Sequence, residues 1–326
     1  MARLKKKDPG AARQQQVETL ADRGFALLEE GEFKKALTVA TQLKELRWSG
    51  GFEIEARAHA GLGDLARATA CLESGVEVAP DAWANWQLLG SYRSDRGDFI
   101  GAEVAYTRAL SCPGADQDAI TLNRAILATR QADPERALRL ASEVRHPDLA
   151  ARTISVRMRA LELSGKTREA LAIGVDATRP DAGISPDDVR MLVSRVVHLR
   201  LVLGDNRLEI RTFLRRHWSP DIDSAHLLAA FRELDGVEAN EHCGYFYLLV
   251  QARLLPGHPE ATHAEGYFAR FHAVAPSAKE ALPFVARLLD ERAELRVSES
   301  ERLEARSQGF QGVYWSAPGR TYFETA

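Results

Sequence analysis

The chain contains few cysteines and no long apolar segment, and each absence excludes a class of protein. The three cysteines, Cys71, Cys112 and Cys243, are too few and too scattered for a disulfide framework, which favours a reducing compartment. No window approaches 18 uncharged apolar residues, so we expect no membrane-spanning segment. Because no apolar stretch of signal-peptide length follows the first residues, the sequence predicts a cytoplasmic protein.

The chain as a whole also lacks a surplus of charge of one sign. The net charge is −3 with 27% charged residues, which is neither the basic excess of a general nucleic-acid binder nor the composition of a disordered protein. We therefore expect no nucleic-acid partner. Four of the first seven residues are basic, and we interpret residues 1–16 as a flexible basic arm.

Charge is nevertheless segregated along the sequence. Residues 151–216 hold 13 lysines and arginines against 8 aspartates and glutamates, whereas residues 221–300 hold 7 against 13. Such a separation can guide an acidic partner, steer a dimer or have no role, and it leaves the oligomeric state open.

Motifs for catalysis and cofactor binding are missing. The sequence has no glycine-rich phosphate loop, zinc metalloprotease helix, paired CxxC or serine nucleophile elbow. Seven of the nine histidines follow residue 197, but His258 and His263 are five apart, which does not suit two metal ligands one helical turn apart. His242 and Cys243 are adjacent, so on a helix their side chains would point apart. We expect no catalytic residue, no metal site and no cofactor.

A repeat of about 34 residues runs through the first half of the chain. Alanine recurs in steps of 32, 34, 35 and 33 residues, at Ala36, Ala68, Ala102, Ala137 and Ala170. Each alanine lies five residues after a turn position, and these positions are Gly31, Gly63, Gly97, Ala132 and Gly165. Apolar residues at helical spacing flank each turn and predict a helix–turn–helix unit. Because one such unit cannot bury its apolar face alone, neighbouring units are expected to stack into an all-α solenoid.

The third unit shows the pattern most clearly. Its matching residues are Trp86, Leu89, Gly90, Gly97, Phe99, Ala102, Tyr106, Ala109 and Pro113. This order of aromatic, small and proline residues resembles the tetratricopeptide repeat (TPR), and five units in register cover residues 17–182. The resemblance implies a solenoid of helical hairpins wound as a right-handed superhelix.

Beyond residue 182 the register becomes irregular, and we interpret residues 183–297 as divergent TPR-like hairpins with a capping helix. A sixth hairpin is expected at Asp187–Pro220. Residues 252–276 resemble a further unit with Pro256–Pro259 as its turn, and Glu280–Arg296 is expected to be the capping helix. The whole array would then contain about seven hairpins.

The segment 298–326 is expected to be an aromatic tail. Its aromatic residues lie among Gly, Ser and Pro, and they are Phe310, Tyr314, Trp315, Tyr322 and Phe323. They could fold back over helix ends, dock on a partner or belong to a further domain. We count Tyr314 and Trp315 as candidate partner-binding residues.

The resemblance implies that a peptide, helix or folded protein binds in a concave groove lined by the first helix of each hairpin. The groove positions of the third to fifth units are Gln87, Ser91, Asp95, Leu122, Ile126, Arg130, Arg152, Ser155, Arg159 and Glu162. Arg152 and Arg159 lie two helical turns apart on one face, where they could bind carboxylates of an acidic partner or simply form a solvated surface.

The opening units do not favour a clamp for a C-terminal carboxylate. The family version of that clamp has Lys and Asn where this chain has Ala21, Phe25, Glu53 and Arg57. We therefore expect a non-catalytic scaffold or adaptor for a protein or peptide. The alternatives are a regulatory TPR protein that senses a small molecule or signalling peptide, and an enzyme with its site between His198 and Phe323.

Overall fold

The computed structural model describes residues 9–219, 224–258, 261, 263–289, 293–304 and 309–323. The chain divides into two compact units, Met1–Leu149 and Ala150–Ala326, and each is described by itself. Of the expected flexible arm, residues 1–8 lie outside the described residues, whereas residues 9–16 form the start of a helix, so the prediction is wrong for that part. Among the described residues, no helix is long and apolar enough to cross a membrane.

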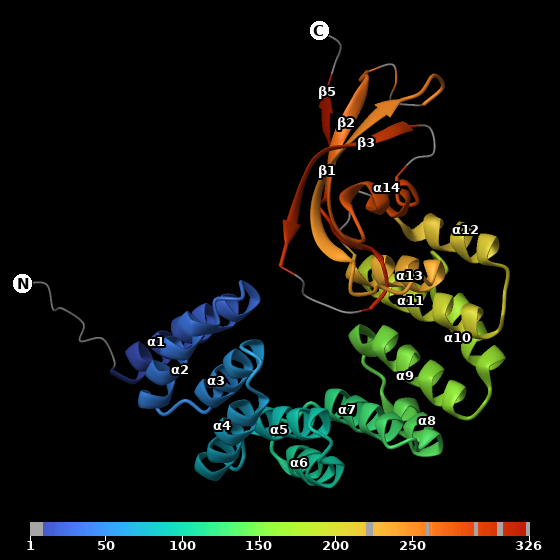
Figure 1. Ribbon diagram of the computed structural model, residues 1–326. Coiled ribbons are helices and arrows are strands. Elements are labelled where there is room, and N and C mark those ends of the chain that lie inside the picture. The colour runs from blue at the N-terminus through green and yellow to red at the C-terminus, as the bar shows by residue number, and fades with distance from the viewer. Residues whose placement is uncertain are drawn as a thin grey trace, which may run out of the picture. The chain divides into compact units, whose positions relative to one another are not determined.

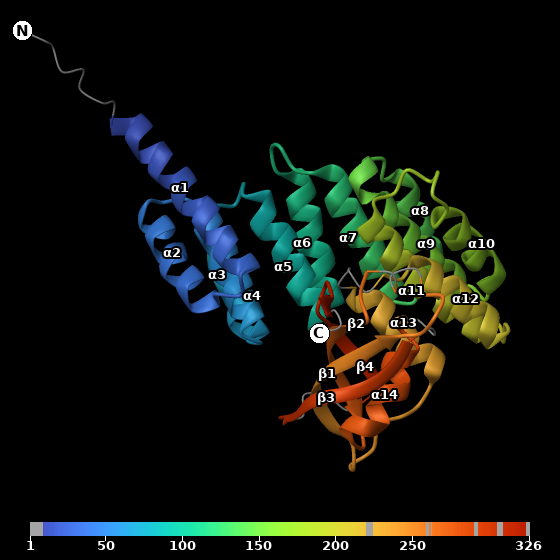
Figure 2. The same cartoon turned by 90° about the horizontal axis from the view of Figure 1, so that it is seen from above.

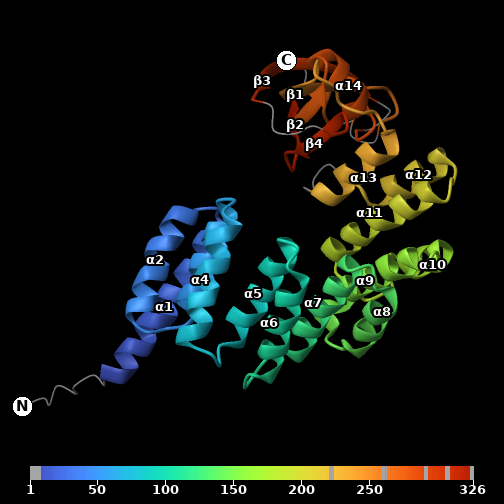
Figure 3. The ribbon, with the colours of Figure 1, turned by 60° about the horizontal axis from the view of Figure 1, so that its bottom comes forward.

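The first unit consists of helices that pair as successive antiparallel hairpins (Figure 1, Figure 3). Its helices are α1 (Pro9–Glu29), α2 (Phe33–Glu45), α3 (Gly50–Gly61), α4 (Leu65–Val78), α5 (Trp83–Asp95), α6 (Phe99–Ser111), α7 (Gln117–Arg130) and α8 (Pro134–Glu143), followed by a 3₁₀ turn at Pro147–Leu149. Each hairpin packs against the next, as α2 does on α3 and α4 on α5. The predicted helical hairpins are therefore confirmed here.

The repeated small residues explain how each hairpin closes. The five recurrent alanines are fully buried, because the two helices approach too closely for a larger side chain. All five turn positions have positive φ, from 54° at Ala132 to 85° at Gly63, a left-handed conformation that favours glycine. In three turns the next residue is an aspartate, Asp64, Asp98 or Asp133, whose side chain accepts a backbone hydrogen bond and caps the second helix.

The second unit begins with helices and ends with a sheet (Figure 1). The helices are α9 (Ala150–Leu163), α10 (Thr167–Ala177), α11 (Pro186–Val202), α12 (Arg207–His217), α13 (Ala225–Asp235) and α14 (Ala278–Ala286). The antiparallel strands are β1 (Gly244–Leu254), β2 (Gly266–Ala275), β3 (Ala293–Leu303), β4 (Gly312–Ser316) and β5 (Thr321–Phe323). The strand order is β3-β1-β2-β4, and β5 pairs with the other end of β2. The β1–β2 register places Gly244 opposite Ala275.

The core of this unit lies between one face of the sheet and the helices α11 to α14. Alternate residues of β1 and β2 are buried and pack with side chains of these helices, among them Leu248, Val250, Tyr267, Phe271, Val197, Leu214, Phe231 and Val285. Figure 2 shows α13 and α14 beside the strands, and α14 contacts β2, β3 and β4. The last helices of the array and the sheet therefore share one hydrophobic core.

The prediction of an all-α fold is wrong for the C-terminal part of the chain. The hairpin expected at residues 252–276, with Pro256–Pro259 as an inter-helix turn, is the β1–β2 hairpin. The buried residues Tyr267 and Phe271 are four apart, a spacing that puts two side chains on one face in a helix and in a strand alike. The spacing of apolar residues alone therefore could not separate the two structures.

The expected capping helix and aromatic tail also need correction. Helix α14 ends at Ala286, and the segment expected to complete the helix at Arg296 enters β3 at Ala293. The expected tail contains the end of β3 and the strands β4 and β5, so its described part belongs to the sheet. The described chain thus has six helical hairpins followed by α13 and the sheet, instead of about seven hairpins.

Candidate functional sites on the inner helices and in a cationic cavity

In the first unit, most of the predicted groove residues contact neighbouring helices. Arg130 at the end of α7 donates a hydrogen bond to Asp95 on α5 at 2.6 Å, and the Ser91 hydroxyl lies 3.2 Å from the Tyr106 hydroxyl. Leu122 is fully buried, so it belongs to the core and is not available to a partner. Gln87 and Ile126 are half-buried on α5 and α7. The first helices α5 and α7 are therefore joined by a charged pair at one end.

In the second unit, the predicted groove residues of α9 lead into a charged network. Arg152 is exposed, Ser155 is half-buried, and Arg159 donates a hydrogen bond to Glu162 at 3.0 Å. The Glu162 carboxylate also accepts a hydrogen bond from Arg195 on α11. Nε2 of His198 lies 3.3 Å from Glu162, and its Nδ1 lies 2.6 Å from Glu233 on α13. The first helices α9, α11 and α13 are thus linked side by side.

The Glu162 carboxylate is shared by two guanidinium groups, those of Arg159 and Arg195, and Glu233 adds a second carboxylate to the network. Burial alone would raise the pKa of the Glu162 carboxyl, but the hydrogen bond from Arg159 and the charge of Arg195 hold that pKa below its ordinary value. Glu162 therefore stays ionised between two guanidinium groups. Among the described residues, no carboxylate pairs with Arg152, so this face keeps a positive surplus.

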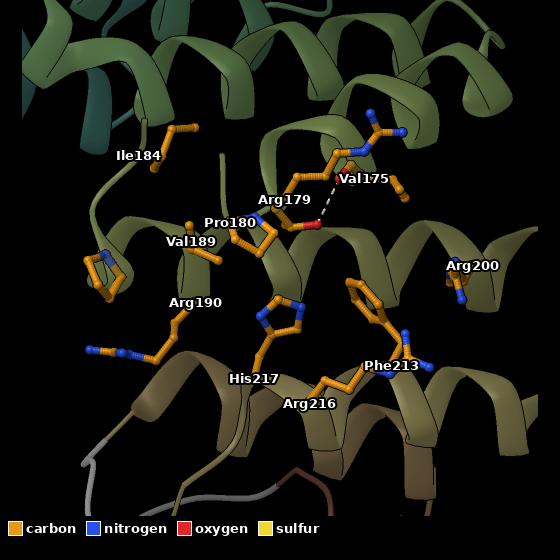
Figure 4. A pocket seen from close by; sticks show the side chains of 12 residues that line it. Val175, Arg179, Pro180, Ile184, Val189, Arg190, Arg200, Phe213, Arg216 and His217 are labelled. Atoms are coloured by element: carbon orange, nitrogen blue, oxygen red, sulfur yellow. Dashed lines mark hydrogen bonds between the residues drawn. The ribbon is translucent and has the colours of Figure 1, made fainter. Parts of the chain in front are cut away.

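A cavity of about 690 Å³ lies elsewhere in the second unit, between α10, α11 and α12. Figure 4 shows its lining residues, which come from the end of α10, the following loop and the two helices of the sixth hairpin. The apolar part of the lining consists of Val175, Pro180, Ile184, Pro186, Val189 and Phe213. The polar part consists of Thr178, Arg179, Arg190, Arg200, Arg216 and His217.

The lining of this cavity contains four arginines and a histidine but no carboxylate. Arg200 stacks over the Phe213 ring at 4.9 Å, and the same ring meets His217 edge to face with centroids 5.0 Å apart. Burial, together with the charge of Arg216, lowers the pKa of His217. The site therefore combines an apolar wall with positive charge.

The sequence did not single out the cavity residues or the network partners Arg195, His198 and Glu233. The one signal that pointed to them was the excess of basic residues in 151–216, which holds all four cavity arginines and Arg195. That excess does not indicate which side chains meet in the fold, because the residues come from segments far apart in the sequence.

The two aromatic candidates of the C-terminal segment lie in β4. The Tyr314 hydroxyl donates a hydrogen bond to the Phe310 carbonyl at 2.8 Å, and the Arg232 guanidinium lies over its ring at 3.8 Å. Trp315 lies opposite His272 of β2, with ring centroids 4.8 Å apart. Both side chains therefore contact other residues of their own unit.

The histidines of the C-terminal part lie in separate environments. His242 is exposed beside Glu241, His258 is buried, and His272 contacts aromatic rings of the sheet. Within the described residues, one group of three potential metal ligands occurs, in the first unit: Glu55, His59 and Cys71.

This group is not set up to hold a cation. Lys44 already donates a hydrogen bond to Glu55 at 2.6 Å. Burial, followed by the charge of Glu55, raises the pKa of the Cys71 thiol to about 11, which disfavours the thiolate that a metal needs.

Comparisons with known proteins support the fold. No family model and no curated protein sequence matches the chain. The solved structure of PilW, a type IV pilus biogenesis factor, is 14% identical, covers 62% of this chain and 93% of its own, and gives a TM-score of 0.51. A tetratricopeptide repeat protein from Parabacteroides merdae is also 14% identical, with coverage of 62% and 77% and a TM-score of 0.49.

Proposed function

We propose that this chain, whose helical hairpins have the tetratricopeptide-repeat fold, is a non-catalytic interaction module that binds an acidic segment of a partner protein along α9 and α11. The observation that supports this function best is the exposed Arg152, which has no carboxylate partner among the described residues and lies on the same helix as the network around Glu162. Two guanidinium groups share this carboxylate, and Arg152 lies exposed two turns away from Arg159 on the same helix. Guanidinium groups bind carboxylates through paired hydrogen bonds, so the surface suits aspartate or glutamate side chains.

The arginines of this face are not needed to build the hairpin. Arg152 and Arg159 are exposed, while the apolar residues of the same helix, such as Val156 and Met158, are buried. Exposed charged residues of this kind contribute little to stability, so they are available for binding. A scaffold function in a reducing, cytoplasmic setting also agrees with three cysteines that are all unpaired.

Selection from a random peptide library displayed on phage tests the proposal. The full chain serves as bait, and the counter-selection uses a variant with Arg152→Ala and Arg159→Ala. The matched control carries Arg157→Ala and Arg168→Ala. Both residues are exposed and lie in the same unit, so these substitutions remove the same charge as those of the first variant. Arg157 lies on the other side of α9 from Arg152.

We expect to select peptides rich in Asp and Glu. The natural chain and the control should bind these peptides, and the Arg152/Arg159 variant should not. Peptides without acidic residues, or acidic peptides that all three proteins bind equally, would contradict it.

A further inference from the structure

We propose that the cavity between α10, α11 and α12 binds a small organic anion with a hydrophobic body. This site is separate from the surface of α9 and α11 described above, and it concerns a different class of ligand. Its lining does not include Arg152, Arg159, Glu162 or Arg195, so the two sites can be tested independently.

The size and the apolar wall of the cavity indicate an organic ligand. Its volume of about 690 Å³ lies within the range of small-molecule sites, and it far exceeds the space that an inorganic ion fills. The apolar lining includes Val175, Pro180, Val189 and the Phe213 ring, which surround the cavity in Figure 4. An apolar wall of this kind gains from covering a hydrocarbon or aromatic body, whereas a hydrated ion would leave it exposed to water.

The charge of the lining indicates an anion. Arg179 pairs with Asp176 at 3.1 Å, Arg190 with Asp187, and Arg200 lies 4.0 Å from Asp205. None of these three carboxylates lines the cavity, and Arg216 has no carboxylate partner among the described residues. The cavity therefore keeps a positive potential that an anionic group would offset.

The Arg200 guanidinium is held in place at the cavity by two contacts. It lies over the Phe213 ring at 4.9 Å, and its Nε lies 4.0 Å from Asp205. The apolar lining favours a hydrocarbon body, and the guanidinium groups favour an anionic group. A ligand that carries both should therefore bind more tightly than a ligand that carries only one of them.

Fluorescence of 8-anilinonaphthalene-1-sulfonate, an aromatic anion, provides the test with the full chain. We expect the dye to bind, and we expect decanoate to displace it. Decyltrimethylammonium has the same hydrocarbon body with the opposite charge, and inorganic phosphate has the charge without the body. Displacement at equal concentration by either of these two, or no binding of the dye at all, would overturn the proposed ligand class.

A pair of variants ties the binding to the cavity. Arg190→Gln with Arg216→Gln should weaken decanoate about tenfold, because charged hydrogen bonds are lost. The control Arg157→Gln with Arg168→Gln removes the same charge outside the cavity and should leave decanoate binding unchanged. Circular dichroism confirms that both variants are folded, and a second cavity variant, Ile184→Glu, adds a carboxylate to the lining and should also weaken decanoate. Equal affinity in all four proteins would overturn the assignment of the site.

Discussion

At the scale of single residues, the turn positions show how much a short pattern can establish. The regular spacing of turn residues and alanines predicted five hairpin turns, and all five turn residues have the left-handed backbone that such turns need. Four of them are glycines, but the fourth turn has Ala132 at φ 54°, where a side chain is strained. The turn itself could be predicted from the sequence, and the strain could not, since it depends on the backbone angle.

Replacing that alanine should stabilise the protein. Ala132→Gly relieves the left-handed strain, and after the greater flexibility of glycine in the unfolded chain is counted, the free energy of unfolding should rise by about 0.5–1 kcal/mol. Gly97→Ala, the reverse change at the equivalent turn, should lower it by about 1 kcal/mol; no neighbouring atom lies within 4 Å of the added Cβ, so only the backbone is tested. Urea denaturation measures both. A loss of stability in Ala132→Gly would contradict this explanation of the turn.

The histidine of the cavity should make stability depend on pH. The pKa of His217 is lowered in the folded protein by burial and by Arg216, while Arg179, Arg190 and Arg200 line the same cavity. The unfolded chain therefore takes up a proton first as pH falls, so the stability present above the unfolded pKa of about 6.5 is lost below it. The free energy of unfolding should fall more between pH 7 and pH 5 in the natural chain than in His217→Gln. An equal fall in both would contradict the lowered pKa.

At the scale of elements, helices and strands were not equally predictable. The first five hairpins could be predicted because a turn residue and a buried alanine recur five residues apart in each unit. In the sheet, the alternation of buried Leu248, Val250 and Ala252 with less buried residues indicates a strand. The sequence does not show this alternation, because Leu249 is apolar as well, and the apolar residues that follow have a spacing that a continued repeat also satisfies. The many aromatic residues of β1 and β2 indicate strands more clearly than the spacing of the apolar residues does.

Two phenylalanines of β2 distinguish a strand from a helix at this place. Phe271 is fully buried in the shared core, whereas Phe268 lies on the opposite face, half-buried against Phe323. Phe271→Ala should therefore lower the free energy of unfolding by about 3–5 kcal/mol, and Phe268→Ala by about 1–2 kcal/mol. On a helix the two residues, three apart, would share a face and cost similar amounts. Equal losses in urea denaturation would contradict the strand assignment.

At the scale of the whole molecule, the sequence showed an excess of basic residues but not where their side chains lie in the fold. The basic residues of 151–216 include Arg159 and Arg195 in the network around Glu162 and four arginines in the cavity of the sixth hairpin. Arg159 and Glu162 were predicted to face a groove, but the partners of Glu162 on the next hairpin, Arg195 and His198, lie 33 and 36 positions further along the chain. Pairings over such distances depend on how successive hairpins pack, which one repeat cannot reveal.

Binding of an acidic segment at α9 is tested by the affinity of one selected acidic peptide for three proteins. Fluorescence anisotropy with the labelled peptide compares the natural chain, the Arg152/Arg159 variant and the Arg157/Arg168 control. We expect Kd to rise about tenfold or more in the Arg152/Arg159 variant and less than about twofold in the control. The melting temperatures should agree within about 2 °C, because all four arginines are exposed. The same Kd in all three proteins would contradict binding at α9.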